Sequence, residues 1–95
     1  MNKLEKNFKK IDSITDSMEM INDSISFWEK RMNKCFAECE ELENNEWHPS
    51  FEEKKDSLRK EMVFVLTKIR AENQQLDLLD LKIEELYKAI LESQK

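Results

Sequence analysis

The residues of this sequence best suited to chemistry are two cysteines and one histidine near the middle of the chain. Cys35 and Cys39 form a C-x-x-x-C pair, and His48 follows nine residues after the second thiol. A structural zinc site takes four ligands, and the sequence holds no further cysteine or histidine, so this set is incomplete. A helix also holds sulfurs at positions i and i+4 poorly for a disulfide bond. We therefore expect free thiols, no metal and no cofactor.

Other combinations that would support catalysis are also missing from the sequence. His48 has no serine or cysteine nucleophile in a recognisable motif, and a chain without glycine has no loop to cradle phosphate. The many carboxylates are expected on solvent-exposed helix faces, and a thin helical body leaves little room for a concave pocket. The sequence predicts a protein without enzyme activity and without a small-molecule substrate.

Composition indicates a single domain built from long helices. The 95 residues are 39% charged and 39% hydrophobic, with one proline and a net charge of −5. This mixture is typical of coiled coils and is too apolar for a disordered acidic chain. The negative charge argues against nucleic acid and acidic membranes as partners. No apolar run approaches the ~20 residues of a membrane span, and the start lacks a signal-peptide core, so we expect a cytoplasmic protein without membrane insertion.

Apolar residues in both halves of the chain recur at alternating steps of three and four. That spacing keeps one stripe of a helix facing a partner helix. The first stripe contains Ile11, Ile14, Met18, Ile21, Ile25, Trp28, Met32, Cys35, Cys39 and Leu42. The second stripe contains Phe51, Leu58, Met62, Val65, Ile69, Leu76, Leu79, Ile83, Leu86 and Ile90. Two long heptad-bearing helices are therefore predicted.

Two polar residues, Lys55 and Glu72, interrupt the second stripe. Polar residues at core positions select register and partner in coiled coils. Alternatively, both side chains lie at the periphery of the stripe and extend their charged groups to solvent.

The single proline marks the boundary between the two helices. Pro49 lacks an amide hydrogen and disfavours helical geometry at the residue before it, and Asn44 and Asn45 tolerate loop conformations. Ser50 and Glu53 then form an S-x-x-E capping box at the start of the second helix. The helices are thus predicted to meet at a short corner.

The predicted fold is an all-α antiparallel helical hairpin that forms coiled coils or bundles. We expect one domain over residues 1–95, with helices over 2–44 and 50–93, a turn over 45–49, and Asn2 as the first N-cap. A short link favours antiparallel neighbours. The acidic end of the first helix and the basic start of the second oppose their own helix dipoles but match across the hairpin, as do the lysine-rich and glutamate-rich far ends.

Two apolar patches on the second helix predict association with another protein. The run from Met62 to Leu66 is apolar all round for more than a turn, and a leucine-rich segment follows. One partner helix leaves much of both patches open, and burying a large apolar side chain contributes about 1.5–3 kcal/mol. Predicted partner-binding residues are Met62, Val63, Phe64, Val65, Leu66, Ile69, Leu76, Leu78, Leu79, Leu81, Ile83, Leu86 and Trp28, together with Trp47, which packs under the turn or anchors a partner.

The second half of the chain resembles snapin and its relatives. In that family a proline and an aromatic residue lead into a basic, valine-rich helix with leucines at heptad steps. The comparable positions are Pro49, Phe51, Arg59, Lys60, Met62, Val65, Ile69, Leu76, Leu79 and Ile83. The segment from Ile11 to Ser13 and the heptads after it are similar to the family's first coiled-coil segment. The chain departs from the family by one residue at the corner and by a more acidic first half.

The resemblance implies a non-catalytic subunit of complexes that build lysosome-related organelles and position lysosomes, with SNARE proteins among its contacts. Two other classes use short helical hairpins: bacterial secretion chaperones that mask a partner's amphipathic helix, and kinetochore or spindle coiled-coil subunits. A trafficking subunit should assemble stably with several helical chains, a secretion chaperone should bind one secreted protein transiently, and a kinetochore subunit should co-purify with microtubule-attachment proteins. In every case the expected partner is a helical protein or a second copy.

Overall fold

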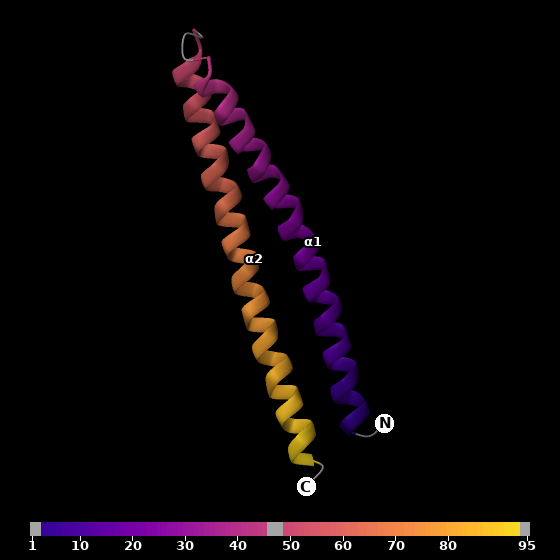
Figure 1. Cartoon of the computed structure of the whole chain (residues 1–95). Coiled ribbons are helices and arrows are strands. Elements are labelled where there is room, and N and C mark those ends of the chain that lie inside the picture. The colour runs from indigo at the N-terminus through magenta and orange to yellow at the C-terminus, as the bar shows by residue number, and fades with distance from the viewer. Residues whose placement is uncertain (1–2, 46–48, 94–95) are drawn as a thin grey trace.

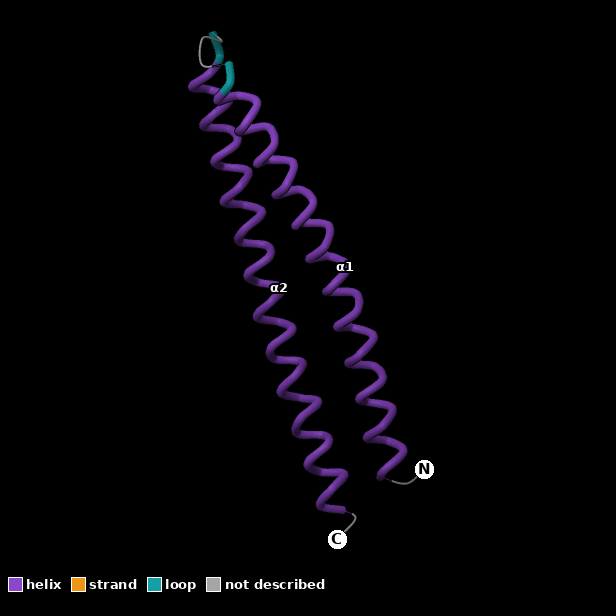
Figure 2. The backbone as a smooth tube through the Cα atoms, viewed as in Figure 1, coloured by secondary structure: helices purple, strands orange, loops and turns teal. Residues whose placement is uncertain are grey.

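The chain forms a hairpin of two long helices, as a computed structural model shows (Figure 1). The structure describes residues 3–45 and 49–93, in which α1 spans Lys3–Glu43 and α2 spans Phe51–Ser93. The helices lie side by side in opposite directions, so the start of α1 and the end of α2 lie at the same end (Figure 2). The molecule measures 72 × 15 × 15 Å. The predicted all-α hairpin is confirmed, and the helix ends lie within one residue of the expected boundaries.

Hydrogen bonds from two asparagines close the end of α1. The backbone N–H of Asn44 donates to the carbonyl of Glu40 at 3.2 Å, and that of Asn45 donates to Leu42 at 2.9 Å. The Asn45 side-chain amide donates to the carbonyl of Glu41 at 3.0 Å. These donors satisfy carbonyls that a helix end leaves without intrahelical partners. None of the described residues has a positive φ, so this part of the turn needs no glycine.

The start of α2 lies where the proline and serine predict it. The carbonyl of Ser50 accepts a 2.9 Å hydrogen bond from the backbone N–H of Lys54, which makes Ser50 the N-cap residue. Glu53 lies in the first turn, where a carboxylate interacts favourably with the helix dipole. Asn2, Trp47 and His48 lie outside the described residues, so the roles predicted for Asn2 and Trp47 stay predictions.

The two hydrophobic stripes pack against each other between the helices. With Ile11 at heptad position a and Ile14 at d in α1, and Met62 at a and Val65 at d in α2, every stripe member falls at a or d. All of them are buried or half-buried. The most enclosed are Cys35 and Val65, each only 1% exposed. The core is therefore a row of side chains along the length of the hairpin, apolar except at Lys55 and Glu72 of α2.

An ion pair between α1 and α2 lies closer to the turn than to the far end of the hairpin. The Arg31 guanidinium contacts the Glu61 carboxylate, and both residues occupy heptad position g. Exposed pairs of this kind contribute about 0–1 kcal/mol, so this contact supports the antiparallel orientation more than the overall stability. The sequence predicted opposite charges near the two ends of the hairpin and did not single out this pair.

Replacing Val65 by aspartate should unfold the hairpin, because the carboxylate has no partner or water at this enclosed position. We expect Val65→Asp to lower the free energy of unfolding by about 3 kcal/mol or more, measured by urea denaturation and circular dichroism. The matched control is Thr67→Asp, two residues further along on the exposed side of α2, which should change it by less than about 0.5 kcal/mol. Equal effects of the two substitutions would show that Val65 is not a core residue.

Candidate interaction surface

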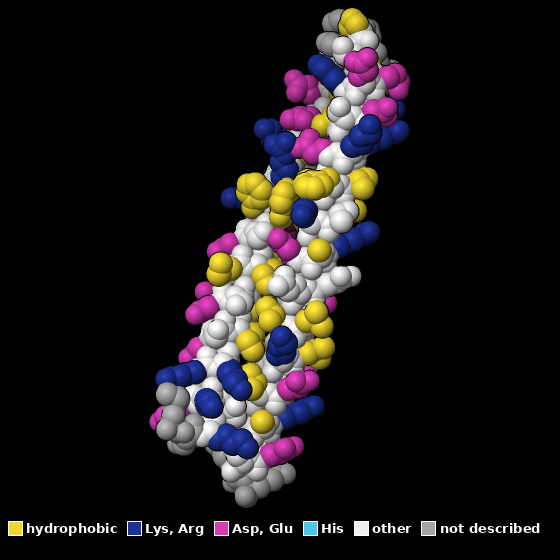
Figure 3. Space-filling model, turned by 180° about the vertical axis from the view of Figure 1, so that it is seen from behind, with side chains coloured by type: hydrophobic (Ala, Val, Ile, Leu, Met, Phe, Trp, Pro, Cys, Tyr) yellow, Lys and Arg dark blue, Asp and Glu magenta, His cyan; other side chains and the backbone are white. Residues whose placement is uncertain are grey.

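Many large apolar side chains remain exposed outside the shared core. Figure 3 shows hydrophobic side chains of both helices reaching the surface, including a band that crosses the hairpin. The large apolar side chains of this exposed set have between 39% and 73% of their surface accessible to solvent. Single exposed apolar residues are ordinary, so their grouping decides whether they form a surface for binding. The exposed set is Phe8, Met20, Phe27, Phe36, Val63, Phe64, Leu66, Leu78, Leu81, Tyr87 and Leu91.

Heptad positions divide the exposed surface into two faces on opposite sides of the core. A groove lined by Phe36 and Leu66, both at position e, with Val63 at b, shows that the e and b positions of both helices share one side. The ion pair between Arg31 and Glu61 shows that the g positions meet on the other side. We call these the e/b face and the g/c face. Each face contains side chains of both helices.

The g/c face carries an aromatic cluster that crosses from α1 to α2. Trp28 contacts Phe27 with ring centroids 5.1 Å apart and Phe64 with centroids 5.8 Å apart, both in edge-to-face geometry. The ammonium group of Lys68 lies 5.4 Å from the centre of the Phe64 ring. Edge-to-face pairs contribute about 0.5–1.5 kcal/mol beyond area burial. The cluster is therefore pre-arranged by contacts within the chain, while both phenylalanines stay exposed.

The e/b face carries an apolar groove between the helices. Its volume is about 720 Å³, and Glu29, Asn33 and Arg59 are the polar residues that line it. The apolar lining consists of Met32, Phe36, Met62, Val63, Leu66 and Ile69. Flexible methionine side chains adapt to irregular partners, so this groove suits the apolar side chains of another helix.

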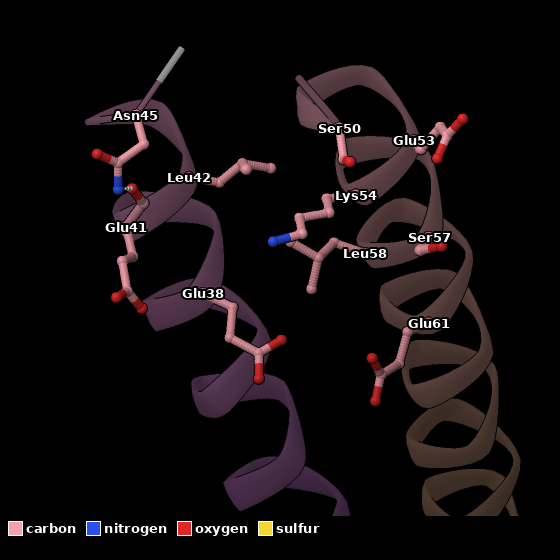
Figure 4. Close-up of a pocket in the computed structure, with 10 residues that line it drawn as sticks. All are labelled: Glu38, Glu41, Leu42, Asn45, Ser50, Glu53, Lys54, Ser57, Leu58 and Glu61. Atoms are coloured by element: carbon pink, nitrogen blue, oxygen red, sulfur yellow. Dashed lines mark hydrogen bonds between the residues drawn. The ribbon is translucent and has the colours of Figure 1, made fainter. Parts of the chain in front are cut away.

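The groove nearest the turn is lined by charged and polar side chains together with two leucines (Figure 4). Its volume is about 700 Å³, and both helices line it. The Lys54 ammonium group points toward α1, and the carboxylates of Glu38 and Glu61 point into the space between the helices. Four glutamates and one lysine line the groove, so its charge is predominantly negative.

Glu72 is half-buried and bonds across to α1, whereas Lys55, also half-buried, interacts within its own helix. Oε1 of Glu72 accepts a 2.6 Å hydrogen bond from the Ser24 hydroxyl of α1. Oε2 is buried and, among the described residues, has no hydrogen-bond partner. The ammonium group of Lys55 lies 5.5 Å from the Phe51 ring centre on α2. Glu72 thus makes the kind of interhelical polar contact that selects register, and Lys55 does not.

The two cysteines are core residues with free thiols. Cys35 is buried and Cys39 is half-buried, with its sulfur 3.9 Å from the Met62 sulfur. Burial raises the pKa of the Cys35 thiol, and the neighbouring Glu61 carboxylate raises it further, which keeps the thiol protonated and unreactive. Within residues 3–45 and 49–93, no cluster of three or more His, Cys, Asp or Glu side chains is arranged to hold a metal ion. Neither helix, over its described length, is apolar enough to span a bilayer.

The residues predicted to bind a partner fall into two groups in the structure. The exposed group is Val63, Phe64, Leu66, Leu78 and Leu81. The other group lies in the interhelical stripes and is Met62, Val65, Ile69, Leu76, Leu79, Ile83, Leu86 and Trp28.

Val65 offers no surface to a partner, because α1 already covers it. In the hairpin its side chain packs in the core, and its role in partner binding stays a prediction.

Phe27 and Phe36 of α1 were not among the predicted residues, although both are large, exposed and central to the two faces. Their signal in the sequence is their position, one residue before or after the stripe members Trp28 and Cys35. A heptad assignment of the first helix places them at c and e, beside the core.

Replacing Glu72 by leucine should stabilise the isolated hairpin. The change removes a buried carboxylate oxygen that lacks a partner, which costs about 1–3 kcal/mol, and adds an apolar side chain at position d. We expect Glu72→Leu to raise the free energy of unfolding by a similar amount in urea denaturation. Glu72→Gln, which keeps an acceptor for Ser24, is the control and should give a smaller gain. A less stable leucine variant would show that the carboxylate stabilises the core.

Comparison of the chain with protein-family models, with curated proteins and with solved structures finds no match.

Proposed function

We propose that this chain is a non-catalytic helical subunit whose outer faces bind other helical proteins. The observation that carries the proposal is that two apolar clusters stay exposed beside a core that the chain has already closed by itself. The cluster around Phe27 and Phe64 and the groove around Phe36 and Leu66 each combine side chains of both helices. A folded hairpin therefore presents them together, as a binding surface requires.

The extent of exposed surface supports the same proposal. The chain exposes 7653 Å², whereas a compact protein of 11.5 kDa exposes about 5,800 Å². The excess is on the order of 1,900 Å², within the ~1,000–2,500 Å² that each partner buries in an obligate interface. Assembly with further helices would bring the exposed area of this chain to that of a globular subunit.

The proposed pathway rests on the sequence resemblance alone. The proline and aromatic residue at 49 and 51, followed by a basic helix with heptad leucines, are similar to snapin-like subunits. On that basis we propose a cytoplasmic component of a vesicle or lysosome trafficking complex, with several helical sibling chains as partners. The two alternative classes, secretion chaperones and kinetochore subunits, would be distinguished from a trafficking subunit by the proteins that co-purify with the chain.

Serine at four exposed apolar positions should abolish assembly and leave the hairpin folded. The variant combines Phe27→Ser, Phe36→Ser, Phe64→Ser and Leu66→Ser. Each lost burial contributes about 1.5–3 kcal/mol, so we expect partner affinity to fall more than about 100-fold. Affinity purification with mass spectrometry identifies the partners, and light scattering of the isolated chain measures self-association.

The control variant places four serines on the outer f positions, at Asp16, Asp23, Thr67 and Gln74, all exposed. It should assemble as the unaltered chain does, with equal helix content by circular dichroism. A monodisperse monomer that co-purifies with no helical protein would contradict the proposed function.

A further inference from the structure

Charged side chains are distributed unequally between the two faces. Among the described residues, the e and b positions hold eleven carboxylates and two arginines, and all thirteen are exposed. The carboxylates of α1 are Glu5, Asp12, Glu19, Glu29, Glu40 and Glu43. Those of α2 are Glu52, Asp56, Asp77, Asp80 and Glu84. In the same described ranges the g and c positions hold eight lysines or arginines and five glutamates. The e/b face is thus strongly acidic, and the g/c face is moderately basic.

The apolar groove interrupts the acidic face about a third of the way from the turn. Arg59 lines the groove and Arg70 follows one turn beyond Leu66, so the only two cations at described e and b positions flank its apolar residues. Carboxylates continue on both sides, with Asp56 toward the turn and Asp77 toward the far end. From the turn to the far end, the e/b face therefore consists of an acidic segment, the apolar groove and a second acidic segment.

We propose that the e/b face docks a basic amphipathic helix of another protein. Its apolar side chains enter the groove at Phe36, Val63 and Leu66, and lysines or arginines on both flanks face the carboxylates. This inference rests on the proposed function and specifies the chemistry of one partner. A positively charged partner is required because desolvating so many like charges against a neutral or acidic surface is unfavourable.

The geometry of the groove favours a helix as the occupant. The groove runs between two antiparallel helices, so a third helix laid along it completes a three-helix arrangement with its own apolar stripe inward. A second copy docked through the same face would bring two acidic surfaces together, and like charges in contact repel. Charge complementarity thus distinguishes a basic partner helix from self-association through this face.

A pair of synthetic peptides tests the proposed chemistry. Each has ~21 residues, or three heptads, with leucine at a and d, and either lysine or glutamate at the other positions. Binding to the full chain is measured by fluorescence anisotropy at salt concentrations from about 50 to 500 mM. We expect the lysine peptide to bind and to weaken at least about tenfold over this range, because salt screens exposed charges. The glutamate peptide should not bind.

Matched variants locate the binding face. Asp77→Lys with Asp80→Lys, at b and e of α2, should weaken the lysine peptide at least about tenfold. Asp16→Lys with Asp23→Lys makes the same change in net charge on the outer f positions of α1 and should have little effect. Leu66→Ser in the groove should weaken binding, whereas Leu81→Ser at an exposed f position should not. Circular dichroism confirms that all four variants remain folded.

The outcomes separate this inference from the proposed function. Equal effects of the two aspartate pairs, equal binding of the two peptides, or binding that requires only a second copy of this chain would overturn the basic-helix proposal. Co-purification of other helical proteins in those cases would leave the proposed function intact. If the lysine peptide does not bind and no helical protein co-purifies with the chain, both proposals are contradicted.

Discussion

The packing of one hydrophobic stripe of α1 against one stripe of α2 holds the whole molecule together. Most helical stability in proteins comes from packing an apolar face, and each of these helices has one long continuous face to bury. The stripe uses two of every seven positions. Closing the hairpin therefore leaves most of each helix surface exposed. The side chains on that exposed surface determine which other molecules the hairpin can bind.

Most of the fold was predictable because its determinants are local or periodic. Pro49 and Ser50 set one helix boundary through backbone geometry and capping, and the alternation of threes and fours along both halves identified every core residue in the stripes. The antiparallel direction followed from a short link and from the charges at the two ends. None of these inferences needed knowledge of which residues on different helices lie opposite each other.

The candidate surface was less predictable because it depends on that pairing. The contact of Trp28 with Phe64 and the hydrogen bond from Ser24 to Glu72 join residues far apart in the sequence. Whether an apolar residue beside the stripe joins a cluster depends on the neighbour that the other helix supplies. Leu66 shares a groove with Phe36, whereas Leu81 faces outward at position f. Apolar runs on one helix alone could not separate these cases.

The half-buried carboxylate of Glu72 would link the stability of the hairpin to the partner binding proposed above. The hydrogen bond from the Ser24 hydroxyl to Oε1 of Glu72 joins α1 to α2 and favours their observed register. The unpaired Oε2 of the same side chain weakens the core at this position. A partner that binds only the folded hairpin stabilises it in proportion to occupancy. In the proposed assembly the free energy that such a partner adds depends on its concentration and affinity, and it would offset the cost of the unpaired Glu72 oxygen.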